Sequence, residues 1–197
     1  IVAREALAWQ AAGHDVRVSV NLTVPDLLDL SLPGTIAETL GDVGVSPSFL
    51  DLEITESVFM SNPERVGRML AILSEMGVGI SIDDYGTGYS SLAYLSSLPV
   101  GELKIDRSFV TGLCEHVRNA EIVRSTIQLG HTLGLGVVAE GVEAPQQLAA
   151  IDDLGCDEVQ GYLLSRPLPV SAVAAWAAEA RSARIALYGA STCTASS

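Results

Sequence analysis

The stretch that decides the fold is LDLEITESVFMSNPERVGRMLAILSEMGVGISIDD, residues 50–84. It begins and ends with short runs rich in Leu, Ile and Val, at residues 50–55 and 78–83, a composition typical of buried strands. Between them lies a longer amphipathic segment, and Asn62 followed by Pro63 marks the start of a helix there. Two strands joined through a helix pair in parallel by a right-handed crossover, so the stretch predicts one repeat of an α/β fold.

The same alternation continues along most of the chain. Short β-branched runs are each followed by a longer amphipathic stretch, with turn residues between them. Six runs are predicted as strands: residues 16–22, 50–55, 78–83, 102–105, 136–140 and 157–161. Strands that alternate with helices form either an open doubly wound sheet or a closed barrel, and the pattern alone does not separate the two.

The number of repeats favours an incomplete barrel. The chain begins within a predicted helix, with no strand before it, and has 197 residues and six predicted strands. An eight-unit barrel takes about 250 residues. The simplest interpretation is a barrel that lacks its first strands. We expect one partial domain over residues 1–182 and a flexible tail, rich in Ser, Ala and Thr, over residues 183–197.

Composition excludes several classes of protein. The formal net charge of −13 repels polymeric nucleic acid, and 48% hydrophobic residues with only 18% charged residues do not fit a disordered chain. No apolar run approaches the roughly 20 residues of a membrane helix, and residues 1–12 do not resemble a signal peptide. Three widely spaced cysteines fit neither a disulfide framework nor a paired zinc site. We therefore expect a cytoplasmic location, as a separate protein or as the cytoplasmic part of a membrane-anchored one, with no membrane contact by this domain.

Polar residues stand at the end of every predicted strand. In parallel α/β folds the active site lies beyond the carboxyl ends of the strands, so these residues are the candidates for function. In chain order they are Asn21, Glu53 with Glu56, Asp83 with Asp84, Lys104 with Asp106, Glu140 with Glu143, and Gln160. Most offer carboxylate or amide oxygens, with no His or Cys nearby, and hard oxygen ligands favour Mg²⁺, Mn²⁺ or Ca²⁺ over zinc.

The adjacent carboxylates Asp83 and Asp84 indicate a site for two metal ions, because they repel each other unless cations lie between them. Two metals activate a water and stabilise the leaving oxygen in an attack on phosphorus, while Lys104 can offset charge on the phosphoryl oxygens. This chemistry fits a phosphodiesterase. A metal-dependent aldolase or an enolase-like proton abstraction also combines Lys with carboxylates, so these alternatives stay open. Asp106 and Arg107 are interpreted as the start of the next short helix.

Six segments carry a more specific signal because of their order. They are NLT at residues 21–23, DLEITES at 51–57, DDYGTGYSSLAYL at 83–95, LKIDRSFV at 103–110, VVAEGVE at 137–143 and DEVQGYLLSRPLP at 157–169. Together they resemble the EAL domain of bacterial cyclic di-GMP phosphodiesterases, over about residues 1–180. Six matches in order are far more specific than any single motif.

The resemblance implies a fold, a reaction and a set of ligands. The fold would be a TIM-like (β/α) barrel of the EAL type, here without its first strands. The complete domain would be a cyclic-guanylate-specific phosphodiesterase that hydrolyses cyclic di-GMP to linear pGpG with two Mg²⁺ or Mn²⁺ ions. By matching position, the metal ligands would be Asn21, Glu53, Asp83, Asp84 and Glu140.

The resemblance also implies roles for the remaining candidates. Lys104 would contact the attacking water or the phosphate, Gln160 would support the metal and water network, and Glu143 would help to organise the catalytic site around Glu140. Glu56 would anchor a flexible loop that begins at Asp84. That loop often contributes to dimer contacts in similar proteins. A barrel without its opening strands also exposes sheet edges, which invite pairing with another chain, so we expect a homodimer. We also expect sensor or GGDEF domains attached upstream.

Three departures from the family pattern qualify these expectations. The Glu-Ala-Leu signature, which would supply a further metal ligand, is absent and would lie upstream of Ile1. The chain as given is therefore expected to be inactive or nearly so. Tyr85 stands where Phe is usual, and Leu164 stands where an aromatic residue that stacks on guanine is common. The alternative function is a non-catalytic EAL-like receptor or interaction domain that binds cyclic di-GMP, although the intact carboxylates argue against it.

Overall fold

The computed structural model describes residues 7–9, 17–88 and 95–179. The flexible tail expected at residues 183–197 lies outside these ranges and stays a prediction. None of the helices within the ranges combines the length and the hydropathy that a membrane span requires.

The chain forms two compact units. The larger consists of residues 17–166, and the smaller combines residues 1–16 with residues 167–197. In the smaller unit the main described element is a helix over residues 170–179. All of the predicted site residues belong to the larger unit.

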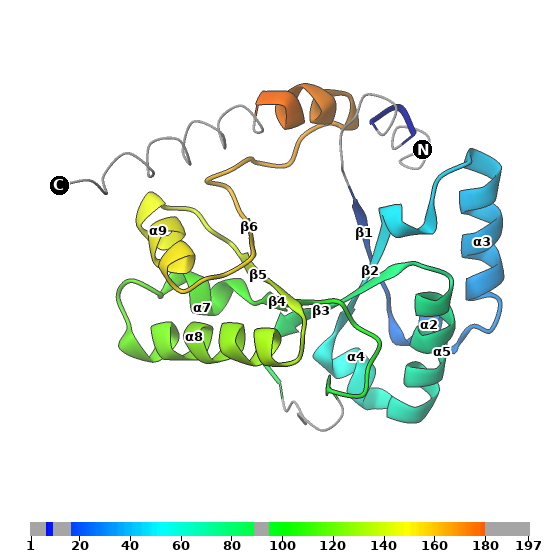
Figure 1. Cartoon of the computed structure of the whole chain (residues 1–197), viewed down its shortest axis with the longest axis horizontal. Coiled ribbons are helices and arrows are strands. Elements are labelled where there is room, and N and C mark those ends of the chain that lie inside the picture. Colours follow the sequence, from blue (N-terminus) through cyan, green and yellow to red (C-terminus); the bar gives the residue numbers. More distant parts are fainter. Residues whose placement is uncertain (1–6, 10–16, 89–94, 180–197) are drawn as a thin grey trace. The chain divides into compact units, whose positions relative to one another are not determined.

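Six parallel strands form one sheet in the larger unit, in the order β1–β2–β3–β4–β5–β6 (Figure 1). The strands are β1 (Val18–Asn21), β2 (Leu50–Thr55), β3 (Gly79–Tyr85), β4 (Glu102–Ile105), β5 (Gly136–Glu140) and β6 (Glu158–Gln160). Every neighbouring pair is parallel. Each strand overlaps one of the six predicted runs, so the alternation of strands and helices is confirmed.

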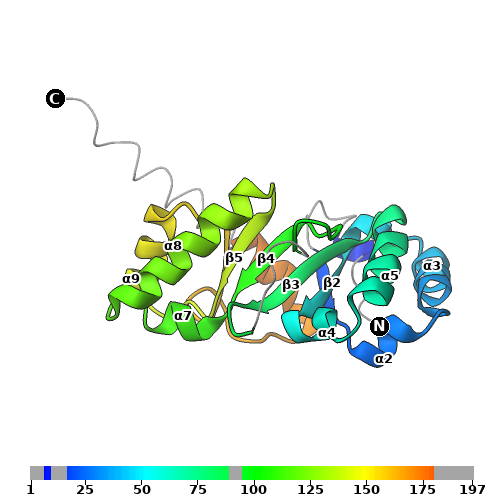
Figure 2. The same ribbon diagram turned by 90° about the horizontal axis from the view of Figure 1, so that it is seen from below.

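Helices connect the strands. Their bounds are α2 (Val24–Leu28), α3 (Leu32–Val43), the 3₁₀ helix η1 (Pro47–Phe49), α4 (Glu56–Ser61), α5 (Pro63–Glu75), α7 (Arg107–Thr111), α8 (Val117–Thr132) and α9 (Pro145–Asp153). Figures 1 and 2 show α7 and α8 beside β4 and β5, and α5 beside β3. The predicted start of α5 is confirmed, since the Asn62 side chain accepts a hydrogen bond from the backbone N of Arg65 at 3.3 Å.

Alternate residues of each strand point to opposite faces of the sheet. One face is apolar: Ile54, Ile82 and Leu103 are almost fully buried, and they pack with helix residues such as Leu70 and Ile127 into one hydrophobic core. Fully burying a side chain of this size contributes about 1.5–3 kcal/mol. The helices therefore cover this face of the sheet.

The opposite face of the sheet is polar, which is unusual for parallel strands buried among helices. Residues paired across parallel strands point to the same side, and the strand register groups the polar ones together. They include Asp51, Glu53, Ser81, Asp83, Glu102, Lys104, Glu140 and Gln160. Buried polar groups are costly unless they have partners, so this polar face is where function is expected.

The sheet is curled with its polar face inward, as the contacts of Arg17 demonstrate. Arg17 precedes β1 at one edge, yet its guanidinium lies 3.4 Å from Glu158 of β6 at the other edge and 3.3 Å from Glu102 of β4. In a flat sheet of six strands the edges would lie roughly 24 Å apart, far beyond the reach of one Arg side chain. The curvature brings residues from distant strands together over the polar face.

Candidate active site

Lys104 is the centre of the polar face. Its side chain is buried on β4, with 5% of the residue exposed. The ammonium Nζ lies 2.5 Å from Glu140 Oε1, 2.8 Å from Glu53 Oε1 and 3.5 Å from Asp83 Oδ1. Carboxylates from β2, β3 and β5 thus converge on one cation from β4, as expected for residues at the carboxyl ends of curled parallel strands.

These contacts set the charges of the site. Burial alone would lower the pKa of Lys104, but hydrogen bonds to Glu140 and Glu53 outweigh it and raise the pKa above the ordinary value. For Glu140, burial raises the pKa; Lys104 opposes this shift, whereas the charges of Asp83 and Glu53 add to it, and the pKa stays raised. Lys104 is therefore a cation at neutral pH, and one cation does not neutralise the carboxylates around it.

Three carboxylates lie close enough to share a metal ion. One oxygen from each of Asp83, Asp84 and Glu140 lies within 4.8 Å of the others. The pKa of Asp84 is raised, first by burial and then by the charges of Asp83 and Asp106. These oxygens repel one another when ionised, and they are the hard ligands that Mg²⁺, Mn²⁺ and Ca²⁺ prefer. The donor set therefore fits a divalent cation.

An irregular strand end lets two consecutive residues face the site. Asp84 has a φ of 54°, in the left-handed region that few non-glycine residues adopt. The register between β3 and β4 shifts between Ile82 and Tyr85, and Asp83 Oδ1 accepts a hydrogen bond from the backbone N of Asp84 at 3.0 Å. Such an irregularity re-aims a side chain that would otherwise point to the opposite face, and strained backbone of this kind often marks functional sites.

Asp106 belongs to this cluster, although the sequence interpretation treated it only as a helix start. It does cap α7, since its Oδ1 accepts a hydrogen bond from the backbone N of Ser108 at 3.0 Å. Its negative charge also lies close enough to Asp84 to raise the pKa of that carboxyl group. The sequence contained a signal, because Asp106 follows Lys104 by two positions, the spacing that in an extended chain places two side chains on the same side.

Asn21 and Gln160 end the two edge strands. Asn21 pairs in register with Glu53, and Gln160 pairs with Glu140, so each amide lies beside a carboxylate of the polar face. Both residues are more exposed than Lys104. The structure thus brings together the residues of all six predicted strand ends. The roles of Asn21 as a metal ligand and of Gln160 as a support stay predictions.

The sequence profile of the EAL domain family matches residues 1–167. The chain belongs to the EAL domain family. The resemblance carried by the six ordered motifs is thereby confirmed, and so is the fold class, a TIM-like (β/α) barrel of the EAL type, of which the described residues form six parallel strands.

Two curated relatives come from Pseudomonas aeruginosa. The cyclic di-GMP phosphodiesterase NbdA is 46% identical over 171 residues, which cover 86% of this chain and 22% of NbdA. The bifunctional diguanylate cyclase/cyclic di-GMP phosphodiesterase MucR is 45% identical over 167 residues, covering 84% of this chain and 24% of MucR. The chain therefore spans less than a quarter of the length of either relative.

Solved structures give the same family. The MucR phosphodiesterase in complex with cyclic di-GMP superposes with a TM-score of 0.84 at 43% identity, over 87% of this chain and 70% of that one. Klebsiella pneumoniae BlrP1, in a complex with manganese and cyclic di-GMP, has a TM-score of 0.76 at 28% identity, over 84% of this chain and 42% of that one. Both similarities cover most of this EAL domain.

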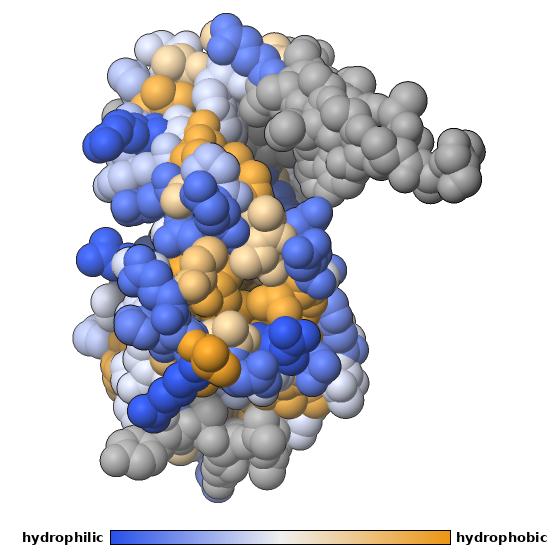
Figure 3. Space-filling view, turned by 90° about the vertical axis from the view of Figure 1, so that its left-hand side faces the viewer, coloured by the Kyte–Doolittle hydropathy of each residue, from blue (hydrophilic) through white to orange (hydrophobic). Residues whose placement is uncertain are grey.

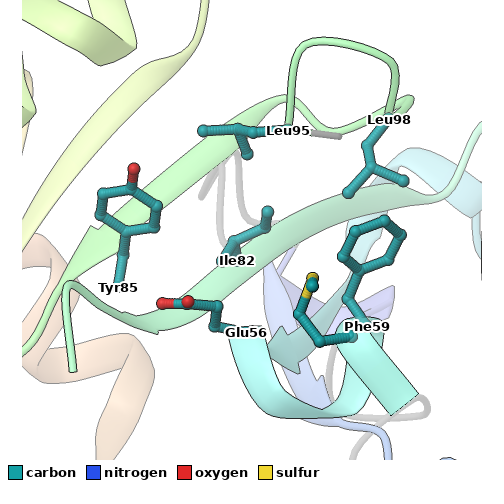
Figure 4. Close-up of a pocket in the computed structure, with 7 residues that line it drawn as sticks. Glu56, Phe59, Ile82, Tyr85, Leu95 and Leu98 are labelled. Atoms are coloured by element: carbon teal, nitrogen blue, oxygen red, sulfur yellow. The ribbon is translucent and has the colours of Figure 1, made fainter. Parts of the chain in front are cut away.

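Glu56 lies at the start of α4, on the apolar side of the sheet rather than among the clustered carboxylates. It is 7% exposed, and neither of its carboxylate oxygens has a hydrogen-bond partner within the described ranges. It lines a small cavity with the apolar side chains of Phe59, Met60, Ile82, Tyr85, Leu95 and Leu98 (Figure 4). A Cβ on Gly88 would lie 2.8 Å from its Oε1, so any other residue there would require the carboxylate of Glu56 to move. The loop that Glu56 is predicted to anchor continues into residues 89–94, outside the described part of the chain.

Three further residues from the sequence analysis are Glu143, Tyr85 and Leu164. Glu143 is exposed and follows Glu140 in the loop after β5. Tyr85 is buried beside Glu56, so its effect on loop packing stays a prediction. Leu164 is 44% exposed. The weaker stacking on guanine expected at this position stays a prediction.

Proposed function

We propose that this EAL domain hydrolyses cyclic di-GMP to linear pGpG in a reaction that requires Mg²⁺ or Mn²⁺. The observation that supports this most strongly is the buried contact of Lys104 with Glu53, Asp83 and Glu140, next to the carboxylate of Asp84. The names of NbdA and MucR, both described as cyclic di-GMP phosphodiesterases, support the choice of substrate.

The carboxylates would hold the metal. Asp83, Asp84 and Glu140 would bind one cation through their clustered oxygens, and Glu53 with Asn21 would help to bind a second. When bound, the metal supplies a nucleophilic water at neutral pH and stabilises charge on the leaving oxygen. The manganese complex of BlrP1 supports Mn²⁺ as one ion that an EAL domain accepts.

Lys104 would act on the phosphate. Its ammonium is held between Glu53 and Glu140, so its position does not depend on substrate. A fixed cation in a site shielded from water stabilises negative charge on phosphoryl oxygens more effectively than a mobile one in solvent. Gln160, paired with Glu140 in register, would orient the neighbouring carboxylate and water.

The test is to extend the domain upstream so that it includes the strand with the Glu-Ala-Leu signature, to incubate it with cyclic di-GMP and Mn²⁺, and to measure pGpG, with EDTA as the blank. Loss of a partner of a metal ligand costs about 10–100-fold in activity, so Asp83→Asn, which removes a ligand itself, should cost at least about a hundredfold. Asp152→Asn, at an exposed carboxylate of α9, is the matched control and should keep full turnover. Tight binding of cyclic di-GMP without pGpG would favour the receptor, and neither binding nor turnover would contradict both functions.

We also propose that the domain acts as a homodimer within a longer signalling protein that carries sensor or GGDEF domains. The bifunctional name of MucR supports attached domains. An open groove on α8, lined by Arg118, Ile122, Ser125 and Leu129 beside Tyr85, offers a surface for a second copy, and Figure 3 shows apolar residues that reach the surface between hydrophilic ones on one face. By light scattering, the wild type should be a dimer and Ile122→Asp should be a monomer. A monomeric wild type would contradict the proposal.

The same proposal assigns the domain to the cytoplasm. Within the described residues, Cys114 is exposed and Cys156 is partly buried, and both are free thiols. Free thiols persist where the compartment is reducing. Fractionation of cells that express the tagged protein checks the location, and recovery from an oxidising compartment would contradict it.

A further inference from the structure

The loop between β5 and α9 carries Glu143 and directly follows Glu140. At the start of α9, Ala144 occupies the N-cap position but has no side-chain acceptor for the free backbone N–H groups. Gln147, three residues later within the helix, instead accepts hydrogen bonds from the two residues that precede the helix. Its Oε1 accepts hydrogen bonds from the backbone N of Glu143 at 2.8 Å and of Ala144 at 2.9 Å.

The other end of the Gln147 amide reaches a different element. Its Nε2 lies 3.4 Å from the carbonyl oxygen of Val110 and 3.4 Å from that of Thr111, the last two residues of α7, and donates to both. The last carbonyls of a helix have no partner within that helix. One side chain therefore joins the loop after β5 to the helix that follows β4.

A second contact joins the same two segments close to the site. Gly141, with a φ of 72°, packs against Arg107 so tightly that a Cβ on the glycine would lie 2.5 Å from the Cβ of Arg107. On its other side, the loop is held to β6 by the hydrogen bond from the backbone N of Val142 to the carbonyl oxygen of Gln160, at 3.0 Å. The segment that follows Glu140 is thus fixed from both sides.

We propose that Gln147 is a positioning residue of the metal site, an inference that rests on the proposed function. By joining the loop after β5 to α7, it holds Glu140 of β5 in register with Lys104 of β4 and close to Asp106, the N-cap residue of α7. Within the described part of the chain, the hydrogen-bond partners of the Gln147 side chain are all backbone atoms, and none belongs to a proposed metal ligand. Gln147 acts through the backbone on which these ligands stand.

Two variants separate this role from ordinary helix capping. Gln147→Glu keeps the oxygen that accepts from Glu143 and Ala144 but cannot donate to the carbonyls of α7, so it preserves the cap and breaks the link. Gln147→Met has a similar length and makes neither set of hydrogen bonds. Gln146→Met, on the exposed neighbouring residue, is the matched control.

The measurements are the dissociation constant for Mn²⁺ in the absence of cyclic di-GMP and the hydrogen exchange of residues 141–147. Both Gln147 variants should weaken Mn²⁺ binding about tenfold, the lower end of the loss seen for supports of metal ligands. Exchange at Glu143 and Ala144 should accelerate in Gln147→Met but not in Gln147→Glu, and Gln146→Met should match the wild type in both assays.

An Mn²⁺ affinity that stays within about twofold of the wild type in the folded Gln147 variants would overturn the proposal, even if their melting temperatures fall, because a simple cap would behave in that way. If Gln147→Met does not fold, Gln147→Glu decides the outcome alone. Since neither assay uses cyclic di-GMP, a wild type that binds Mn²⁺ but forms no pGpG would contradict the proposed reaction without affecting this test.

Discussion

The polar face of the sheet carries a charged cluster at each end of its strands. The two clusters differ in how their charges are paired and in how far they are exposed to water. At the amino ends, Arg17 contacts Glu102 and Glu158, and the Arg17 side chain is 48% exposed. At the carboxyl ends, Lys104 contacts three carboxylates, and its side chain is 6% exposed. Similar residue types on one surface thus occupy very different environments.

The difference separates a structural cluster from a functional one. At the amino ends the charges are partly screened by water, and the buried carboxylate of Asp51 accepts a hydrogen bond from Ser81 Oγ at 2.6 Å. These interactions hold the curl of the sheet. At the carboxyl ends, the oxygens of Asp83, Asp84 and Glu140 converge on one place and outnumber their single cation. Paired charges stabilise the fold, whereas converging charges prepare a site for a metal.

The largest effect on stability is expected for Lys104→Met in the metal-free protein. Removing the cation leaves Glu53 and Glu140 buried without a partner, which should lower the free energy of unfolding by about 3 kcal/mol. Urea denaturation in the presence of EDTA measures the loss. A loss below about 1 kcal/mol, the range of surface ion pairs, would show that the carboxyl-end cluster is no more tightly coupled than the amino-end one.

Addition of Mn²⁺ should stabilise the wild type by about 2.7 kcal/mol at a concentration a hundredfold above its dissociation constant. Asp83→Asn should lose most of this gain, because it removes a ligand. Asp51→Asn changes a carboxylate on the same face at the opposite strand ends, so it should keep the full gain whatever its own stability. Thermal unfolding with and without Mn²⁺ measures the stabilisation of each variant by the metal. If Asp51→Asn lost as much of this stabilisation as Asp83→Asn, the two ends of the strands would not differ in metal binding.

A smaller effect is expected from pH. The folded-state pKa values of Glu140 and Asp84 lie above their ordinary values of 4.5 and 3.8, so the folded protein binds protons more readily than the unfolded chain. The contribution of these groups to stability should rise as the pH falls from neutral through the raised pKa values, and should level off below the ordinary ones.

Urea midpoints at about pH 7 and about pH 5.5, in EDTA, measure this contribution as the difference between the wild type and Glu140→Gln. If the wild type lost more stability than Glu140→Gln when the pH was lowered, the predicted direction of the pH effect would be wrong.

The smallest effect is expected for Arg17→Met, which should cost less than about 1 kcal/mol because its ion pairs are partly exposed. The loss should shrink further at high salt, whereas the loss caused by Lys104→Met should change little. Urea denaturation at two salt concentrations checks this. A large, salt-independent loss for Arg17→Met would mean that both clusters are buried networks.

The sequence was sufficient for the order of the fold. All six strands overlap their predicted positions because each run combines β-branched residues with turn residues at its ends. Helix boundaries were harder to predict, and the start of α8 at Val117 is an example. Its N-cap residue, His116, makes no side-chain capping hydrogen bond, so the sequence held no clear start signal.

The site was predictable only in part. Glu53 and Lys104 stood out because each charged residue interrupts an apolar strand, where an unpaired charge is costly. Asp83 and Asp84 can both approach the site because Asp84 adopts a left-handed conformation, and no local sequence pattern predicts that conformation. Gln147 was missed because its four hydrogen-bond partners come from two segments far apart in the sequence. Contacts of that kind depend on tertiary structure.

The central claim is that the carboxyl-end cluster binds a divalent cation and the amino-end cluster does not. The most direct measurement is anomalous diffraction from crystals of the protein soaked in Mn²⁺. The account predicts a manganese peak bounded by the oxygens of Asp83, Asp84 and Glu140, and none beside Arg17. Density without a metal peak among these three carboxylates, at saturating Mn²⁺, would contradict it.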